Sequence, residues 1–204
     1  MTEPGGPATQ TGIRYQNTAA ALYLGRLLDL RPRPVRERVI EVRIEAPTHV
    51  DDIVVTFADR HRAFIQARSS FHPTAPDAHG FWCAFARQWR DLNHADGDRV
   101  VIYAGETTTP LQDLREAAER AAASSDETEW VQRLSGRQQT LVKAIDVILP
   151  KDPESPEAYS LLGILAVEIR PVRDIERDET PRWMPDAVPP ARRAARFVAR
   201  LRRW

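Results

Sequence analysis

The segment from Asp52 to Arg68 decides the fold: Asp52-Ile-Val-Val-Thr-Phe57, then Ala-Asp-Arg-His, then Arg62-Ala-Phe-Ile-Gln66-Ala67-Arg68. Two runs of apolar and β-branched residues flank a short polar stretch, a pattern typical of two strands joined by a hairpin. Successive side chains of a strand point to opposite faces. Asp52 therefore lies on one face of the first strand, and Gln66 shares a face of the second strand with Arg68.

The length of the hairpin loop decides whether these polar side chains meet. We expect a three-residue loop, residues 59–61, which pairs Ala58 with Arg62 and places Asp52 opposite Arg68, with Cβ atoms about 5 Å apart. A two-residue loop would place Ala67 opposite Asp52 and send the side chains to different faces. The candidate site therefore requires a hairpin loop that keeps Asp52, Gln66 and Arg68 on one face, which the structure can test.

Outward from the hairpin, apolar periodicity predicts an α/β domain with helix, three strands, helix, strand and a helical half. Helices are expected over residues 13–30, around 81–89, and over roughly 110–124, 126–134 and 137–148. Strands are expected over residues 39–45, 52–57, 62–68, 99–106 and 164–169. The second helix carries an aromatic stripe, Phe81, Trp82, Phe85 and Trp89, which we interpret as core packing, with base stacking as the alternative.

Composition limits the classes of function. The chain of 204 residues has 29 basic and 29 acidic residues, so nucleic-acid affinity would have to come from a local basic patch. A single cysteine, Cys83, excludes an internal disulfide and is interpreted as a small buried hydrophobe. The five histidines lack metal-ligand spacing and are interpreted as surface or capping residues. With no signal peptide or membrane span in its pattern, the protein is expected to be cytoplasmic.

Three stretches together resemble a known family: Gly12-Ile-Arg-Tyr-Gln-Asn-Thr-Ala-Ala-Ala-Leu-Tyr-Leu, Ile44-Glu-Ala-Pro-Thr-His-Val-Asp-Asp-Ile-Val-Val, and Phe64-Ile-Gln-Ala-Arg-Ser-Ser. The Asp…Gln-x-basic pattern is similar to the PD-(D/E)XK nuclease superfamily, Asp…(Glu/Gln)-x-Lys, with Arg68 in place of the lysine. The order and spacing resemble the nuclease effector domains of bacterial anti-phage defence proteins, often fused to NACHT-type or other STAND ATPases or to nucleotide-sensing modules.

The resemblance implies a restriction-endonuclease-like αβββαβ core with a mixed central sheet flanked by helices, plus helical C-terminal additions. The nuclease-like domain is expected over residues 12–170. Composition adds two flanking segments to it: residues 1–11, rich in Gly, Pro and Thr, are expected to be disordered, and residues 171–204 are expected to form a Pro-rich linker with a basic amphipathic helix. The resemblance further implies Mg²⁺ or Mn²⁺ as cofactor, double-stranded DNA as substrate, a sensor or ATPase partner, and homo-oligomers in the active state.

The resemblance also assigns roles to residues. Asp52, the side chain of Gln66 and the backbone carbonyl of Ala67 correspond to metal ligands, and Arg68 corresponds to the family lysine near the scissile phosphate. Each has a plainer interpretation. Asp52 suits a solvated turn or a salt bridge with Arg68, and Gln66 suits an edge strand. Arginine binds phosphate well, but its pKa is too high for a general base.

Further residues complete the predicted site. The resemblance implies an additional carboxylate at Glu45 and a metal-proximal amide at Gln16, against the alternatives of an exposed strand end and helix surface. Ser69 is predicted to contact nucleic acid beside Arg68. Four arginines of the tail are candidates for DNA phosphates: Arg192, Arg193, Arg196 and Arg200. Docking of a partner helix and a linker to a further domain are the alternatives for the tail, and both are favoured over DNA contact.

Three functions stay open at this point. The first is a Mg²⁺-dependent DNA endonuclease-like effector, attenuated by Arg68. The second is a catalytically inactive pseudonuclease that binds nucleic acid or assembles a complex. The third is a protein-interaction adaptor with an α/β core.

Overall fold

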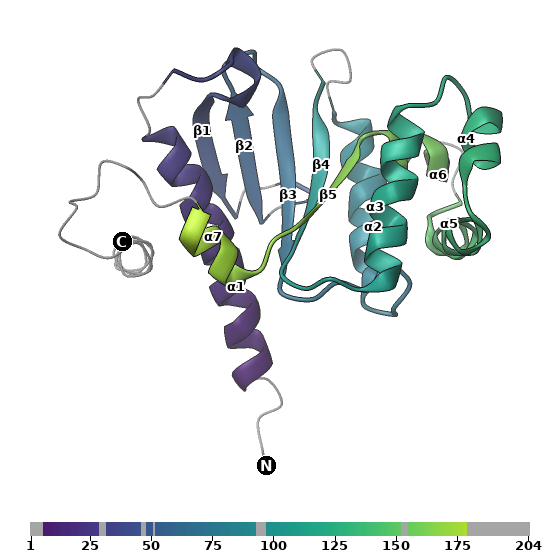
Figure 1. Cartoon of the computed structure of the whole chain (residues 1–204), viewed down its shortest axis with the longest axis horizontal. Coiled ribbons are helices and arrows are strands. Elements are labelled where there is room, and N and C mark those ends of the chain that lie inside the picture. The colour runs from purple at the N-terminus through teal and green to yellow at the C-terminus, as the bar shows by residue number, and fades with distance from the viewer. Residues whose placement is uncertain are drawn as a thin grey trace.

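The computed structural model describes residues 6–28, 32–45, 48–50, 52–92, 97–151 and 155–178. Its centre is a five-stranded sheet with the order β1 (Val39–Ile44), β2 (Ile53–Phe57), β3 (Arg62–Arg68), β4 (Arg99–Ala104) and β5 (Leu165–Ile169) (Figure 1). β1, β2 and β3 pair antiparallel, and β3, β4 and β5 pair parallel. The protein is therefore an α/β protein with a mixed, open sheet, and all five predicted strands form within two residues of their expected bounds.

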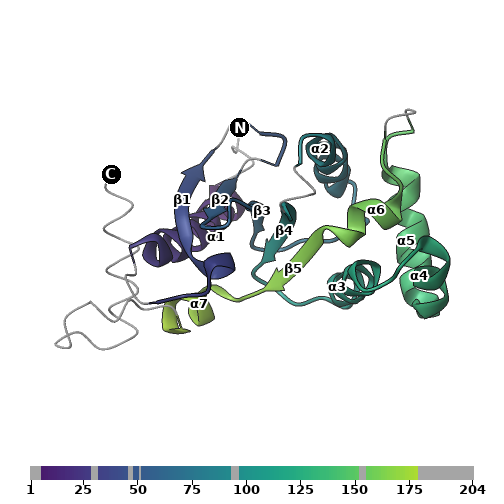
Figure 2. The ribbon, with the colours of Figure 1, turned by 90° about the horizontal axis from the view of Figure 1, so that it is seen from above.

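Helices supply the connections and cover the sheet. In chain order they are α1 (Gly6–Leu27), the 3₁₀ turn η1 (Val35–Glu37), α2 (Ala78–Arg90), α3 (Thr109–Ala122), α4 (Glu127–Arg133), α5 (Gly136–Ile148), α6 (Ala158–Gly163) and α7 (Val172–Asp178). The parallel pairs need crossovers: α2 joins β3 to β4, and α3 to α6 join β4 to β5. Seen from above, α4 and α5 extend the molecule beyond β5, on the side away from β1 (Figure 2).

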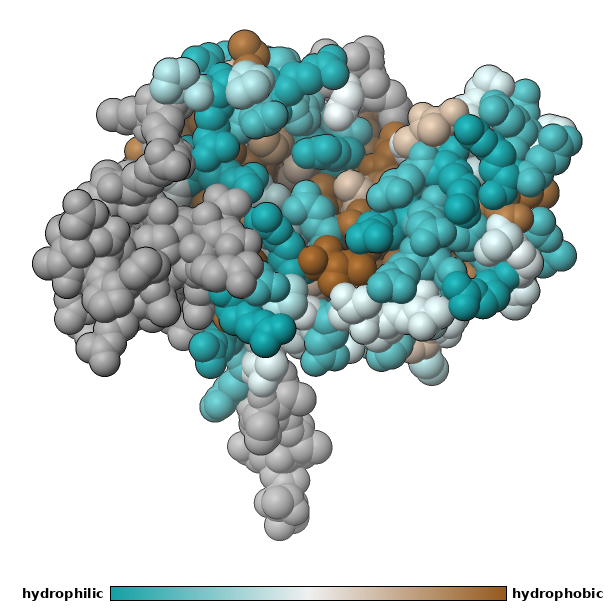
Figure 3. Space-filling model, viewed as in Figure 1, coloured by the Kyte–Doolittle hydropathy of each residue, from teal (hydrophilic) through white to brown (hydrophobic). Residues whose placement is uncertain are grey.

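Two hydrophobic layers cover the two faces of the sheet, because side chains alternate along each strand. On β3, Phe64 packs with the aromatic residues of α2, whereas Ile65 packs with α1. The predicted aromatic stripe is core: Phe81, Trp82 and Phe85 are buried, and Trp89 packs against the same layer. In Figure 3, hydrophilic side chains dominate the outer faces of α3 and α4, while hydrophobic surface is seen between these helices and the sheet.

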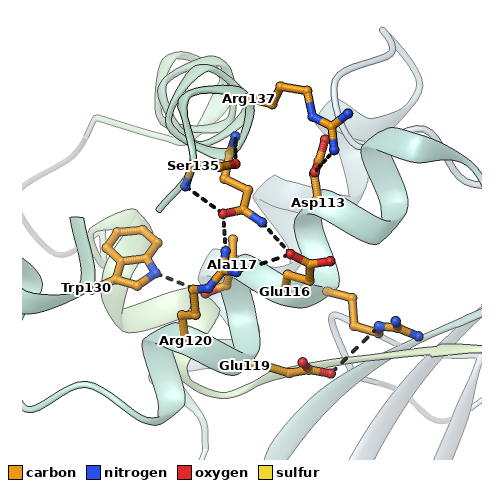
Figure 4. A network of polar contacts seen from close by, with 10 residues as sticks. Asp113, Glu116, Ala117, Glu119, Arg120, Trp130, Ser135 and Arg137 are labelled. Carbon is orange, nitrogen blue, oxygen red and sulfur yellow. Dashed lines mark hydrogen bonds and ion pairs between the residues drawn. The ribbon is translucent and has the colours of Figure 1, made fainter. Parts of the chain in front are cut away.

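Capping residues and a polar network hold the helical addition together. Thr108, Asp126 and Ser135 cap the N-termini of α3, α4 and α5. Gln138, which is buried, accepts hydrogen bonds from Arg120 and from the backbone N–H of Ser135, and donates to Glu116 at 2.8 Å. Figure 4 shows these contacts between α3 and α5, with the Trp130 indole donating to the Ala117 carbonyl nearby. The network fixes α4 and α5 against α3.

The ends of the chain differ from the sequence-based expectations. The first helix begins at Gly6, not Ile13, so part of the segment expected to be disordered is helical. The segment after Pro171, expected to be irregular, starts with α7, which packs against α1. The basic helix predicted over 191–203 lies outside the described residues. No helix in the described part of the chain is both long and apolar enough to cross a membrane.

Candidate functional site

The hairpin between β2 and β3 has a different register from the one expected. Phe57 donates its N–H to the His61 carbonyl at 3.0 Å, so the loop is Ala58-Asp59-Arg60 rather than residues 59–61. Thr56 pairs with Arg62, and continuing the ladder places Asp52 opposite Gln66, not opposite Arg68. The expected Ala58–Arg62 pairing is therefore wrong.

The reason for the shift is local. Arg60 adopts φ +76°, the left-handed conformation that closes a three-residue hairpin loop. The Asp59 carboxylate accepts the His61 N–H, and the His61 ring stacks on Phe57 at 4.3 Å between centroids. His61 is buried, so the surface half of its interpretation as a surface or capping residue is wrong. A shift of two residues preserves the alternation of faces, so Asp52 and Gln66 still meet.

Asp52 directly precedes β2, and its carboxylate contacts both β3 and α1. Its Oδ2 accepts hydrogen bonds from the Gln66 side-chain amide and, at 2.8 Å, from the backbone N–H of Ala67. Its Oδ1 lies 3.4 Å from Nε2 of Gln16, which reaches over from α1. The structure thus brings together Asp52, Gln66, Ala67 and Gln16, four of the predicted site residues.

The backbone of Ala67 adds an oxygen to this group. In a β-strand, the N–H and C=O of one residue point to the same side. The Ala67 N–H points to Asp52, whereas the Arg68 carbonyl accepts the Gly105 N–H on the opposite, β4 side. The Ala67 carbonyl therefore faces the Asp52 side of β3. Carboxylate, amide and backbone carbonyl oxygens are the ligands that Mg²⁺ uses in proteins.

The other predicted site residues lie around this group. Glu45 is exposed at the end of β1 and adopts φ +51°, and its N–H donates to the Asp52 carbonyl at 3.1 Å. Arg68 is exposed, and by strand alternation it projects from the face that carries Gln66. Ser69 is half-buried at the end of β3. The four tail arginines lie outside the described residues: Arg192, Arg193, Arg196 and Arg200.

The loop that carries Asp52 is fixed by a residue that the sequence pattern did not reveal. Gln88 of α2 is buried, and its side-chain oxygen accepts the N–H groups of His49 and Val50 at 3.1 and 3.4 Å. At the end of the same helix, Asp91 lies 3.4 Å from the His49 ring. Because Gln88 lies on α2, which packs in the hydrophobic core, these hydrogen bonds fix His49 and Val50, just before Asp52, to the core.

A cavity of about 390 Å³ lies at the same end of the sheet as Asp52, between α1, the ends of β3 and β4, and α7. Tyr15 donates its hydroxyl to the Arg170 carbonyl at 3.0 Å, and burial raises its pKa well above the usual value, so it is neutral. Two exposed arginines at the rim give the cavity mouth a positive character, offset in part by Glu106. The sequence pattern holds no signal for this cavity, because its lining comes from four distant segments. The lining residues are Thr11, Arg14, Tyr15, Ser69, Gly105, Glu106, Val172 and Arg173.

The described residues contain no group of three or more His, Cys, Asp or Glu side chains placed to hold a metal ion. Any metal site at Asp52 would therefore depend on amide and backbone oxygens besides one carboxylate. Cys83, interpreted as buried, is only half-buried, and its Sγ lies 3.7 Å from the His79 ring on the next turn of α2.

The chain was compared with protein-family models, with curated proteins and with solved structures, and none of them matches. The residues of the site are therefore the basis for assigning a function.

Proposed function

We propose that this chain is a Mg²⁺-dependent DNA endonuclease-like domain with a restriction-endonuclease-like core. The observation that carries the proposal is the meeting of Asp52 with Gln66 and Ala67 at the end of the sheet. The order of α1, three antiparallel strands, α2 and a parallel β4 agrees with the αβββαβ arrangement that the sequence resemblance implies.

The donor set fits a hard divalent cation in number and kind. Asp52 offers a carboxylate, Ala67 a backbone carbonyl and Gln66 an amide oxygen, all oxygen ligands of the type that Mg²⁺ binds together with water. Gln66 now donates its N–H₂ to Asp52, so a half-turn of its amide would present the oxygen instead. When bound, the ion would polarise a phosphoryl oxygen and lower the pKa of a bound water.

The remaining residues of the site have distinct tasks in this proposal. Gln16 holds Oδ1 of Asp52 and so sets the direction of the carboxylate. Arg68 stands exposed at the end of β3, where its guanidinium can bind a phosphate of double-stranded DNA through two parallel hydrogen bonds. A guanidinium group can stabilise negative charge but does not serve as a general base, so the proposed role of Arg68 is electrostatic.

The proposed biological role is that of an effector in bacterial anti-phage defence, active as a homo-oligomer and coupled to a sensor or ATPase partner. Its support is the sequence resemblance over residues 12–105. A pseudonuclease is the second candidate. It is favoured by Arg68 in place of lysine and by the single carboxylate in contact with Gln66.

Cleavage and metal binding test the proposal together. The full chain would be incubated with supercoiled plasmid and Mg²⁺ or Mn²⁺, and Mn²⁺ binding would be followed separately by electron paramagnetic resonance. We expect cleavage that Asp52→Asn abolishes along with Mn²⁺ binding, because the only carboxylate among the proposed ligands is lost. Asp146→Asn is the matched control, since Asp146 is an exposed aspartate on α5, paired with Lys151 at 3.0 Å.

Arg68→Lys separates the two candidates. If the site is an attenuated nuclease, the compact ammonium should raise the cleavage rate above that of the natural chain. If the natural chain and Arg68→Lys are both inert with either metal, the nuclease is excluded. Retained DNA binding would then favour the pseudonuclease.

A further inference from the structure

A second polar cavity, of about 310 Å³, lies at the opposite end of the sheet from Asp52. It is lined by Arg36, Glu37, Asp59, His61, Gly97 and Arg99. These residues come from η1, the β2–β3 loop and the start of β4. β2 separates this cavity from Asp52 by its five residues, about 16 Å at the rise of a strand. The proposed nuclease chemistry makes no use of it.

His61 lines this cavity and is held in one orientation. Its Nδ1 lies 2.5 Å from Oδ1 of Asp59, and its ring lies flat on Phe57, with an interplanar angle of 4°. With Nδ1 engaged by the Asp59 carboxylate, Nε2 is the ring nitrogen that could bind a ligand in the cavity. A carboxylate that fixes one imidazole nitrogen orients the other toward a ligand. The side chain is only 8% exposed, so this orientation is built into the fold.

The Asp59 carboxylate has two partners within the protein, His61 and Arg36. Burial raises its pKa, but the hydrogen bond and charge of His61 outweigh burial, and the pKa of Asp59 is lowered overall. Arg36 also approaches Asp59, with Nε 3.6 Å from Oδ2. Asp59 therefore acts as the anchor of His61 and Arg36 and is ionised at neutral pH.

The lining of the cavity holds two arginines, Arg36 and Arg99, and two carboxylates, Glu37 and Asp59. Asp59 is engaged by His61 and Arg36, and Glu37 is exposed, so that solvent screens its charge. Arg99 is exposed at the edge of the cavity. Gly97, which also lines the cavity, has φ +82°, and among the described residues a Cβ built there would meet nothing within 4 Å.

We propose that this cavity binds a phosphate monoester, held by Arg36, Arg99 and Nε2 of His61. Two guanidinium groups and an imidazole around one hollow suit a tetrahedral oxyanion, and arginine forks match phosphate oxygens. The volume lies at the lower end of the range for small-molecule sites, so it admits a terminal phosphate with a compact attached group. The recognised chemistry is the terminal phosphate, whether of a nucleotide or as free inorganic phosphate.

Binding to the full chain tests the proposal. Inorganic phosphate, a nucleoside 5′-monophosphate and a short DNA duplex without terminal phosphates would each be titrated by calorimetry. The His61 ring nitrogens would be followed by NMR in the same titrations. We expect saturable binding of the monophosphate with a shift of the His61 signals. Arg99→Gln should weaken it about tenfold or more, since it removes charge-assisted hydrogen bonds.

Controls make each outcome decisive. Arg60 is an exposed arginine between Asp59 and His61, but it does not itself line the cavity. Arg60→Gln should therefore leave the affinity for the monophosphate unchanged. Arg99 is exposed, so Arg99→Gln leaves the core intact. Equal binding of phosphate and nucleotide would assign the affinity to the phosphate alone. The proposal is overturned if neither binds saturably, if Arg99→Gln binds like the natural chain, or if only the duplex shifts His61.

Discussion

Gly105, directly after β4, is a point where the structure leaves no room for a side chain. A Cβ at this position would lie 2.8 Å from the Ser69 carbonyl oxygen and 3.0 Å from Cε2 of Tyr15. Neither neighbour can turn aside easily: the first is backbone, and the Tyr15 hydroxyl is held by the Arg170 carbonyl. Gly105→Ala therefore forces a shift of several tenths of an ångström between β3, β4 and α1.

We expect Gly105→Ala to destabilise the fold by about 1–3 kcal/mol, the usual cost of overpacking a site that cannot relax. Gly80→Ala is the matched control. Gly80 lies inside α2, and a Cβ there would have no neighbour within 4 Å, so an alanine should stabilise by about 0.5–1 kcal/mol through helix propensity. The same chemical change should thus have opposite signs at the two positions.

Urea unfolding followed by fluorescence of the five tryptophans would measure both variants. The slope of free energy against urea should stay unchanged, so that the shift in midpoint reports stability alone. A Gly105→Ala variant within about 0.5 kcal/mol of the natural chain would refute the reasoning, because surface substitutions stay within that range. It would show that Ser69 and Tyr15 are not packed tightly against Gly105.

Two further predictions concern buried ionisable groups. Burial raises the pKa of Tyr103 from 10.0 to about 12, and those of Tyr15 and Tyr23 further. Above pH 10 the unfolded chain loses protons that the folded chain keeps, so stability falls by about 1.4 kcal/mol per pH unit for each tyrosine. Tyr103→Phe should make this fall shallower in urea unfolding between about pH 10 and pH 12, and an identical slope would contradict it. Arg62→Met should destabilise the fold by about 3 kcal/mol, because it removes the two guanidinium hydrogen bonds to the Asp98 carboxylate, which is 1% exposed and keeps the backbone N–H of residue 62 as a donor. Asp98→Asn should cost less, because Arg62 is 37% exposed and can reach water; equal losses would count against this asymmetry.

The strands and helices could be predicted because their signals are periodic. β3 alternates so that Phe64 meets one hydrophobic layer and Ile65 the other, and the stripe on α2 repeats every fourth residue. Such patterns depend only on residues a few positions apart. The first helix was harder to delimit, because Gly6 and its neighbours carry little apolar periodicity although the helix begins there.

The hairpin register could not be read from the pattern, because it depends on one backbone conformation. Ala58, Asp59 and Arg60 show no glycine or asparagine at the position that turns left-handed, so the sequence offers no marker for φ +76° at Arg60. The contacts that compensate for this conformation involve His61, through its hydrogen bond to Asp59 and its stacking on Phe57. The loop conformation that places Gln66 opposite Asp52 is thus accompanied by contacts of a buried histidine, which the sequence pattern does not mark.

The contact between Asp52 and Gln66 forms although the predicted hairpin register is wrong, and the reason is physical. A register shift by an odd number of residues moves side chains to the other face of the sheet, whereas an even shift does not. The observed register differs from the expected one by two residues, an even shift. Asp52 therefore still meets the polar side of β3, but it meets Gln66 instead of Arg68. A direct Asp52–Arg68 salt bridge, the plainer alternative for both residues, is what the expected register would have favoured. In the observed register Gln66 lies opposite Asp52, and the Asp52 carboxylate accepts hydrogen bonds from neutral N–H donors. Arg68 lies two residues further along, at the exposed end of β3, where its guanidinium can bind an anion from solvent.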